Sequence, residues 1–295
     1  MSQPVALVTG GASGIGLAVA EHLANYYGYK VALLDIDASK GRAAASDLNA
    51  GGDRCLFLPV DVSDYSQQAQ AFQQVFEWGG NRLDVFFANA GIGDTGSVYK
   101  DLAGIDAATG LPRPADLEIV DVNLNAVLQG THLARHFFAK NSSRRAGGHV
   151  IVTASCLGVY PLHALPLYSA TKHALVGFVR STAPVFKHAL GIAINAILPN
   201  MVETNLMPEA FRPEWDPQKM TPMSTVLRAV DKILTDESVH GATIELCKDE
   251  LVFSGPQAYA TSNSKWVVEE NVLLWERAME VVLPRAAGQN VAMKQ

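Results

Sequence analysis

The sequence predicts a single α/β domain built on a doubly wound, seven-stranded parallel sheet flanked by helices. Short, continuously apolar runs recur along the chain, which is typical of strands buried on both faces. Longer stretches with helical periodicity separate these runs, as the crossovers of a parallel sheet require. A glycine-rich turn follows the first run at once. The expected strands are Val5–Val8, Val31–Leu34, Cys55–Val60, Leu83–Ala88, Val150–Ala154, Ile192–Leu198 and Thr243–Cys247.

The composition describes a globular chain with an ample core. Of 295 residues, 48% are hydrophobic and 18% are charged, and the net charge is −6. The chain has no basic stripe, so we expect no nucleic-acid partner. Three scattered cysteines, Cys55, Cys156 and Cys247, argue against a disulfide framework and a metal site and favour a reducing compartment. Neither a targeting segment nor a membrane span is visible, and a cytoplasmic location is therefore expected.

Three segments depart from the alternation of strands and helices. Residues 93–116 are rich in Gly, Asp and Pro and are expected to form a long loop. Residues 199–225 carry five prolines after the sixth strand, and about 200–225 is expected to be a substrate lid. Residues 265–283 repeat apolar side chains at helical spacing, which predicts an amphipathic helix packed on the core within a C-terminal helical extension over about 262–295. Nothing divides the chain, so residues 1–295 are expected to form one domain.

The glycine-rich turn, Thr9–Gly16, lies between the first strand and a helical pattern over residues 16–26. In this context glycines let the backbone approach a pyrophosphate, while the helix N-terminus supplies N–H groups and a positive dipole end. The turn therefore predicts a dinucleotide site of the Rossmann type, and a turn that serves packing alone is the weaker alternative. The residues expected to bind there are Gly10, Ser13, Gly14, Ile15 and Gly16.

Asp35, at the end of the second apolar run, indicates which dinucleotide is bound. Its carboxylate is placed to accept hydrogen bonds from the adenosine ribose and would repel a 2′-phosphate. Ser13 stands where a basic side chain could have met that phosphate. Both residues favour NAD over NADP, and an NADPH-dependent ketoreductase is the alternative.

Tyr168 and Lys172 are the residues expected to move a proton. They lie four residues apart on a predicted helix and so share a face, and a nearby ammonium lowers the pKa of a phenol from its usual value of about 10. Ser155, just beyond the fifth strand, could hydrogen-bond a substrate oxygen, and Asn123 could hold a water near Lys172. Each residue alone has an ordinary structural explanation. Their occurrence together with the dinucleotide turn predicts hydride transfer at a carbinol or carbonyl carbon.

These motifs resemble the short-chain dehydrogenases/reductases, in their non-extended form, over roughly residues 4–250. Asn123, Ser155, Tyr168 and Lys172 match the catalytic tetrad of that family. The resemblance implies NAD as the cofactor and a homodimer or tetramer as the assembly. It also implies further cofactor contacts, namely Asp61 and Val62 at the adenine, Asn89, Ala90 and Gly91 beside the central strand, and Pro199, Val202 and Thr204 at the nicotinamide.

Within this family, the segments 172–178 and 241–244 resemble the NAD-dependent 15-hydroxyprostaglandin dehydrogenases. Two departures bear on the site and the assembly. Leu165 stands where those enzymes carry a glutamine that binds the substrate hydroxyl, which argues against prostaglandin itself. Pro184 falls inside the helix that begins near Tyr168 and is expected to kink or end it, although the family uses that helix in a dimer interface.

The residues and the resemblance together predict reversible, NAD-dependent oxidation of a secondary alcohol to a ketone. Apolar residues between Ser155 and Tyr168 predict a lipophilic alcohol or ketone as substrate, with Leu157 and Leu165 as contacts and His163 as the polar exception. Two alternatives come from other classes. A catalytically silent dinucleotide-binding regulator would be expected to lack the tyrosine or the lysine, and a methyltransferase leaves both residues unexplained.

Overall fold

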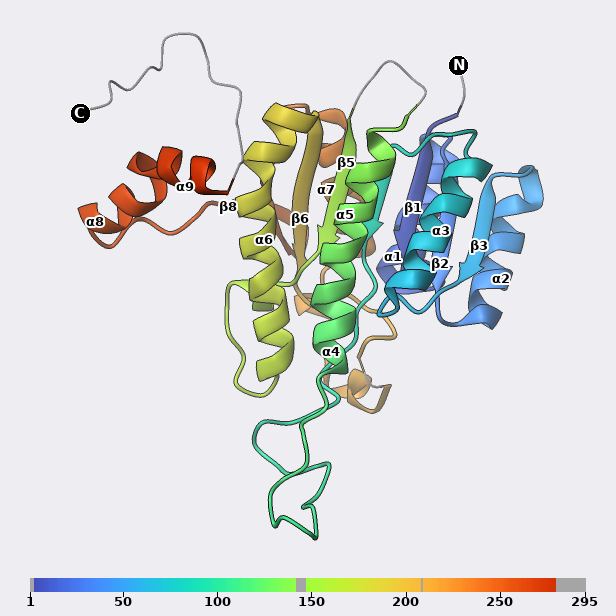
Figure 1. Cartoon of the computed structure of the whole chain (residues 1–295). Coiled ribbons are helices and arrows are strands. Elements are labelled where there is room, and N and C mark those ends of the chain that lie inside the picture. The colour runs from blue at the N-terminus through green and yellow to red at the C-terminus, as the bar shows by residue number, and fades with distance from the viewer. Residues whose placement is uncertain (1–2, 142–146, 208, 280–295) are drawn as a thin grey trace, which may run out of the picture.

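The chain folds as one sheet covered by helices, which confirms the predicted α/β class (Figure 1). The structure is a computed structural model that describes residues 3–141, 147–207 and 209–279. The strands lie in the order β3-β2-β1-β4-β5-β6-β7-β8, and β1 to β7 run parallel. They are β1 (Val5–Thr9), β2 (Lys30–Asp35), β3 (Cys55–Pro59), β4 (Val85–Ala88), β5 (Gly148–Thr153), β6 (Ile192–Pro199), β7 (Thr243–Cys247) and β8 (Glu250–Ser254).

Helices cover both faces of the sheet, so the apolar runs are buried from two sides. In β1, Val5 and Leu7 pack toward one helical layer, whereas Ala6 and Val8 pack toward the other. This two-sided burial is why the strands show no alternation of apolar and polar residues. One layer contains α3 (Tyr65–Trp78), α5 (Ala126–Phe138) and α6 (Pro166–Leu190), and the other contains α1 (Gly14–Tyr26), α2 (Ala38–Leu48) and α7 (Met223–Thr235).

The sheet has one strand more than the sequence predicts. β8 pairs antiparallel with β7 across a tight turn, in which Lys248 adopts a left-handed backbone with φ 56°. β8 lies at the edge of the sheet, and Val252 and Phe253 are 42% and 50% exposed. The apolar run of β8, residues 251–253, has only three residues, which is shorter than the runs that identified the other strands. The seven predicted strands are present and parallel, and β8 is the one that the sequence analysis missed.

Two predictions concern the helices. α6 continues through Pro184 to Leu190, so Pro184 does not end it. The C-terminal segment forms α8 (Ser262–Lys265), a π-helical stretch Trp266–Glu270 and α9 (Val272–Ala278), and residues 280–283 of the predicted helix lie outside the described residues. Trp266 and Trp275 are exposed, and the segment stands apart from the sheet (Figure 1). The prediction that this segment packs on the core is therefore wrong. The spacing of apolar residues predicts that a helix is amphipathic, but it does not determine which surface its apolar face contacts.

The chain order places a crevice between β1 and β4. Strand order reverses there, and the connections leave in opposite directions at the carboxyl ends, which is where α/β folds bind ligands. Residues 93–116 project from this end of the sheet as the predicted long loop, with a single bridge between Ile105 and Pro112 (Figure 1). Among the helices of the described residues, none has the length and apolar character needed to cross a bilayer.

Candidate active site

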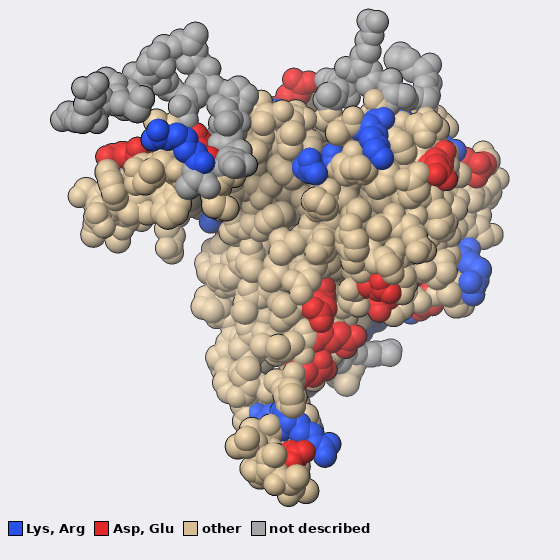
Figure 2. Space-filling view, viewed as in Figure 1, with Lys and Arg blue, Asp and Glu red and all other residues tan. Residues whose placement is uncertain are grey.

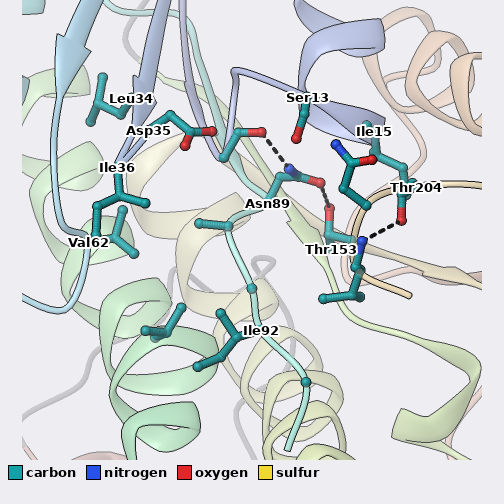
Figure 3. Close-up of a pocket in the computed structure, with 18 of the residues that line it drawn as sticks. Ser13, Ile15, Leu34, Asp35, Ile36, Val62, Asn89, Ile92, Thr153 and Thr204 are labelled. Carbon is teal, nitrogen blue, oxygen red and sulfur yellow. Dashed lines mark hydrogen bonds between the residues drawn. The ribbon is translucent and has the colours of Figure 1, made fainter. Parts of the chain in front are cut away.

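A cavity of about 600 Å³ opens at the carboxyl ends of β1, β2 and β4 (Figure 3). Its size falls in the range of about 300–1,000 Å³ that is usual for cofactor and ligand pockets. Most of the predicted cofactor residues line it, namely Gly10, Ser13, Gly14, Ile15, Asp35, Asp61, Val62, Asn89, Ala90, Gly91, Tyr168, Lys172 and Thr204.

The glycine turn brings the backbone close to the cavity floor. Gly10 has φ 62°, and a Cβ added to it would lie 2.9 Å from the Cα of Ala90. Gly16 does not line the cavity. A Cβ there would lie 2.1 Å from the carbonyl oxygen of Gly10, so this glycine permits the close packing of α1 against the turn.

The N-terminus of α1 is open toward the cavity. Ser13 precedes the helix in an extended conformation, and its side chain makes no capping hydrogen bond. The first N–H groups of a helix have no partner within the helix, and they carry the positive end of its dipole. This turn therefore fits the pyrophosphate of a dinucleotide.

Asp35 is fixed at the end of β2 by backbone donors. Its carboxylate accepts hydrogen bonds from the N–H groups of Ala12 and Asp37, both at 2.9 Å. Asp35 and Ser13 flank the same part of the cavity (Figure 3). Asp61 and Glu118 are further carboxylates in the lining, and Figure 2 shows acidic side chains gathered over α4 (Glu118–Val120). Among the described residues that line the cavity, Lys172 is the one cation.

Asn89 connects the ends of three strands. Its amide nitrogen donates to the carbonyl oxygens of Thr9 and Gly10 at 3.2 and 3.3 Å, and its amide oxygen accepts from the hydroxyl of Thr153 at 3.1 Å. Thr153 lines the cavity but was not predicted, because a threonine at the end of a strand carries no distinctive sequence signal.

Lys172 is buried at the base of the cavity, with 3% of its surface exposed. Its ammonium donates to the carbonyl oxygen of Thr153 at 2.8 Å and lies 5.4 Å from the centre of the Tyr168 ring. Burial penalises the charged form and lowers the pKa of Lys172 to about 8.

Tyr168 does not have the lowered pKa that the sequence predicts. Burial raises the pKa of its phenol to about 12, and a hydrogen bond with Ser155 acts in the opposite direction. The ammonium of Lys172 is directed to Thr153 rather than to the phenol, so the loss of solvent outweighs its attraction. Ser155 is buried beside Tyr168, and its hydroxyl also accepts a hydrogen bond from the N–H of Leu157 at 3.1 Å.

Asn123 is fully buried in a π-helical stretch, Asp121–Asn125, between α4 and α5. Its amide oxygen accepts from the N–H of Ile92 at 2.8 Å, and its amide nitrogen donates to the carbonyl oxygen of Ile92 at 2.9 Å. The side chain therefore holds the chain that leaves β4. A Cβ on Gly91 would lie 3.2 Å from the Asn123 amide oxygen and 3.7 Å from the Lys172 nitrogen, so both side chains lie close to Gly91.

Several predicted contacts do not line the cavity. Val202 is buried in the core behind it. His163 is exposed, and its carbonyl oxygen accepts a hydrogen bond from the hydroxyl of Tyr99 at 3.0 Å. Besides Gly16, the other predicted residues that the cavity lining does not include are Asn123, Ser155, Leu157, Leu165 and Pro199.

Other lining residues were missed because they are ordinary apolar or loop residues. Ile36, Val60 and Ile92 supply apolar surface, and Asn205 and Leu206 come from the segment after β6. Only the three-dimensional arrangement of the strand ends identifies them.

Comparison with known proteins gives consistent matches. A family model described as short chain dehydrogenase matches residues 4–215. The short-chain dehydrogenase/reductase prx6 of Penicillium rubens is 37% identical over 243 residues, which are 82% of this chain and 79% of the relative. Human 15-hydroxyprostaglandin dehydrogenase [NAD(+)] is 35% identical over 206 residues, 69% of this chain and 70% of the relative. These matches confirm the resemblance found from the motifs.

The fold also matches solved structures. The 3-ketoacyl-(acyl-carrier-protein) reductase of Brucella melitensis, solved in complex with NADH, superposes with a TM-score of 0.69. The match covers 83% of this chain and 97% of the other, at 23% sequence identity. At this identity the comparison supports the fold alone.

Proposed function

Because this chain belongs to the short chain dehydrogenase family of oxidoreductases, which bind a nicotinamide dinucleotide, we propose that it oxidises a secondary alcohol to a ketone, reversibly and with NAD. The observation that carries this proposal is the half-buried Tyr168 beside the buried Lys172, both lining a cavity whose glycine turn fits a pyrophosphate. A dinucleotide-binding regulator has no need for a buried cation beside a phenol.

In this proposal Ser155 and Tyr168 hydrogen-bond the substrate oxygen and orient it. The bound dinucleotide supplies the hydride acceptor. Tyr168 takes the hydroxyl proton during oxidation and returns it during reduction, the direction that its raised pKa favours in the protein alone. The positive charges of Lys172 and of an oxidised nicotinamide would lower the phenol pKa toward the working range. Asn123 keeps Gly91 and Ile92 in place against Lys172.

The preference for NAD rests on charge. A 2′-phosphate would face Asp35, with further carboxylates at Asp61 and Glu118 in the lining. The human relative carries NAD(+) in its name, which agrees with this preference. If NADPH bound this protein more tightly than NADH in a fluorescence titration, the alternative of an NADPH-dependent ketoreductase would replace the NAD assignment.

The substrate class rests on the segment between Ser155 and Tyr168. Leu157, Val159 and Leu165 give it an apolar character, so we propose a lipophilic alcohol or ketone as substrate. The human relative is named for a hydroxylated lipid, which is consistent with this class. We also propose that residues 200–225 act as a lid, that the protein is a homodimer or tetramer, and that it works in the cytoplasm.

The substitution Tyr168→Phe tests the proposal. It removes the hydroxyl that transfers the proton and leaves the cavity shape unchanged, so turnover should fall by roughly 10²–10⁴-fold. Turnover is followed by absorbance of the reduced nicotinamide with NAD⁺ and a panel of lipophilic secondary alcohols, and NADH affinity should stay unchanged. Retained turnover in the variant would refute the assignment of Tyr168, and NADH binding without turnover of any alcohol or matching ketone would favour the silent regulator.

A further inference from the structure

The first turn of α6, which carries Tyr168, takes its cap from a distant part of the chain. The residue at its N-cap position is Leu165, whose side chain cannot accept a hydrogen bond. Pro166 has no N–H group, and the N–H of Ser169 donates to the carbonyl oxygen of Leu165. The N–H groups of Leu167 and Tyr168 remain to be satisfied.

The carboxylate of Asp94 satisfies both groups. One of its oxygens accepts from the N–H of Tyr168 at 2.7 Å, and the other accepts from the N–H of Leu167 at 3.2 Å. Asp94 lies 74 residues before Tyr168, at the start of the long loop that leaves β4. A carboxylate at this end of a helix also interacts favourably with the helix dipole.

Asp94 is itself held in place by the site. Two residues earlier, Ile92 has both its N–H and its carbonyl group bonded to the amide of Asn123. Gly91 lies close to the side chains of both Asn123 and Lys172. The short segment from Ile92 to Asp94 is therefore bonded to the π-helical stretch at one end and to the start of α6 at the other.

We propose that Asp94 is a positioning residue for the reaction, which fixes the first turn of α6 and thereby the Tyr168 phenol relative to Ser155 and the cavity. This inference rests on the proposed function. Asp94 is not among the residues that line the cavity, so it acts through Tyr168 rather than on the cofactor. Tyr168 is the third residue of the helix, and fraying of a single turn would move its hydroxyl. A displacement of about 1 Å in a reacting group can cost about 10²-fold in rate.

The test compares Asp94→Ala with Asp94→Asn. The alanine variant removes both acceptors, whereas asparagine keeps one amide oxygen for the Tyr168 N–H and removes the charge. Asp101→Ala is the matched control, because it removes the same charge from an exposed position in the same loop. Two quantities are measured: amide hydrogen exchange of peptides that cover residues 166–172, and steady-state kinetics with NAD⁺ and 2-decanol or 1-phenylethanol.

In Asp94→Ala we expect faster exchange at Leu167 and Tyr168 and a kcat at least about tenfold lower, with KM for NAD⁺ and NADH affinity within about twofold of the unchanged protein. Asp94→Asn should restore kcat to within about threefold, and Asp101→Ala should match the unchanged protein.

Unaltered exchange in Asp94→Ala would overturn the proposal, and so would faster exchange with an unaltered kcat. A loss of NADH affinity that parallels the loss of kcat would also overturn it, because it would indicate general damage to the fold. If the unchanged protein oxidises neither alcohol, the proposed function fails with these substrates, and the exchange measurement still decides whether Asp94 holds the start of α6.

Discussion

Burial sets the protonation of the two side chains proposed to carry the chemistry. It raises the pKa of Tyr168 to about 12 and lowers the pKa of Lys172 to about 8, so each group is pushed toward its neutral form. Near pH 7 the lysine remains largely protonated, and its ammonium is held by the carbonyl oxygen of Thr153. The site in the protein alone thus holds a neutral phenol beside a cation, ready to donate a proton.

The buried lysine should make stability depend on pH. Its pKa is about 8 in the folded protein and about 10.4 when unfolded, so the folded state prefers the neutral amine. Below pH 8 the cost of burying the charge is fully present. It is relieved as pH rises from 8 toward 10.4, because only the unfolded state still binds the proton. Between pH 7 and 9.5 the unfolding free energy of the unchanged protein should rise by on the order of 2 kcal/mol relative to Lys172→Met.

Urea unfolding of both proteins at several pH values checks this expectation. The exposed residue Lys100 supplies the control, because Lys100→Met should show a difference from the unchanged protein that is flat across the same range. A flat difference for Lys172→Met as well would show that the lysine is not desolvated as the structure describes.

Asp35 should set the choice between the two dinucleotides. Asp35→Asn removes the charge that a 2′-phosphate would face, and its single amide oxygen keeps one of the two acceptors for the N–H groups of Ala12 and Asp37. We expect the ratio of NADPH to NADH affinity to rise about tenfold or more, equivalent to roughly 1.4 kcal/mol. Fluorescence titration with both reduced cofactors measures the ratio, and Asp106→Asn on the projecting loop is the control. An unchanged ratio for Asp35→Asn would mean that Asp35 does not face the ribose.

At the scale of elements, the sequence predicts most reliably what a single local pattern determines. The strands β1 to β7 and the glycine turn each have such a pattern, and the structure contains all of them. β8 has an exposed edge and an apolar run of only three residues, so its pairing with β7 is what reveals it. In the site, Tyr168 and Lys172 follow from helical spacing, whereas the contact of Asp94 with Tyr168 spans 74 residues and is set by the packing of the loop.

The same distinction explains Pro184. Locally a proline inside a helix removes one hydrogen bond and clashes with the preceding turn, which predicts a kink or the end of the helix. The neighbouring residues Val179 and Ala183 are buried in the core, and their packing keeps α6 continuous. A pattern read along the chain cannot weigh this tertiary packing against the local cost.

Pro184→Ala should therefore stabilise the protein. The variant restores the missing N–H group to an exposed position of the helix and removes the steric clash of the ring. Proline costs about 3 kcal/mol relative to alanine in a helix interior, and the greater freedom of the unfolded variant offsets part of this gain. We expect a net gain of about 1–2 kcal/mol in urea unfolding, with NADH affinity and kcat unchanged. A loss of stability would show that the fold depends on the proline.

At the scale of the whole molecule, the residues of the site lie together at the carboxyl ends of the parallel strands. Residues from the turn after β1, from the ends of β2 and β4, and from the start of α6 meet in one cavity although they are far apart in the sequence. The opposite ends of the strands contribute no residue to this cavity. A ligand bound in the cavity should therefore contact the strands on both sides of the point between β1 and β4 where the strand order reverses.

Because the cavity lies between the two halves of the sheet, we expect a bound dinucleotide to stabilise the entire domain. A ligand that binds only the folded state raises the unfolding free energy by about 2.7 kcal/mol at a free concentration of 100 times its Kd. We expect NADH at that concentration to raise the unfolding free energy, measured by urea unfolding, by this amount. It should also slow amide exchange at the carboxyl ends of both β1 and β4. NADPH at the same concentration should give a smaller shift, because Asp35 opposes its 2′-phosphate. S-adenosylmethionine, the cofactor of the methyltransferase alternative, should give none. A shift with S-adenosylmethionine and none with NADH would refute the dinucleotide site itself, since this measurement does not depend on any substrate.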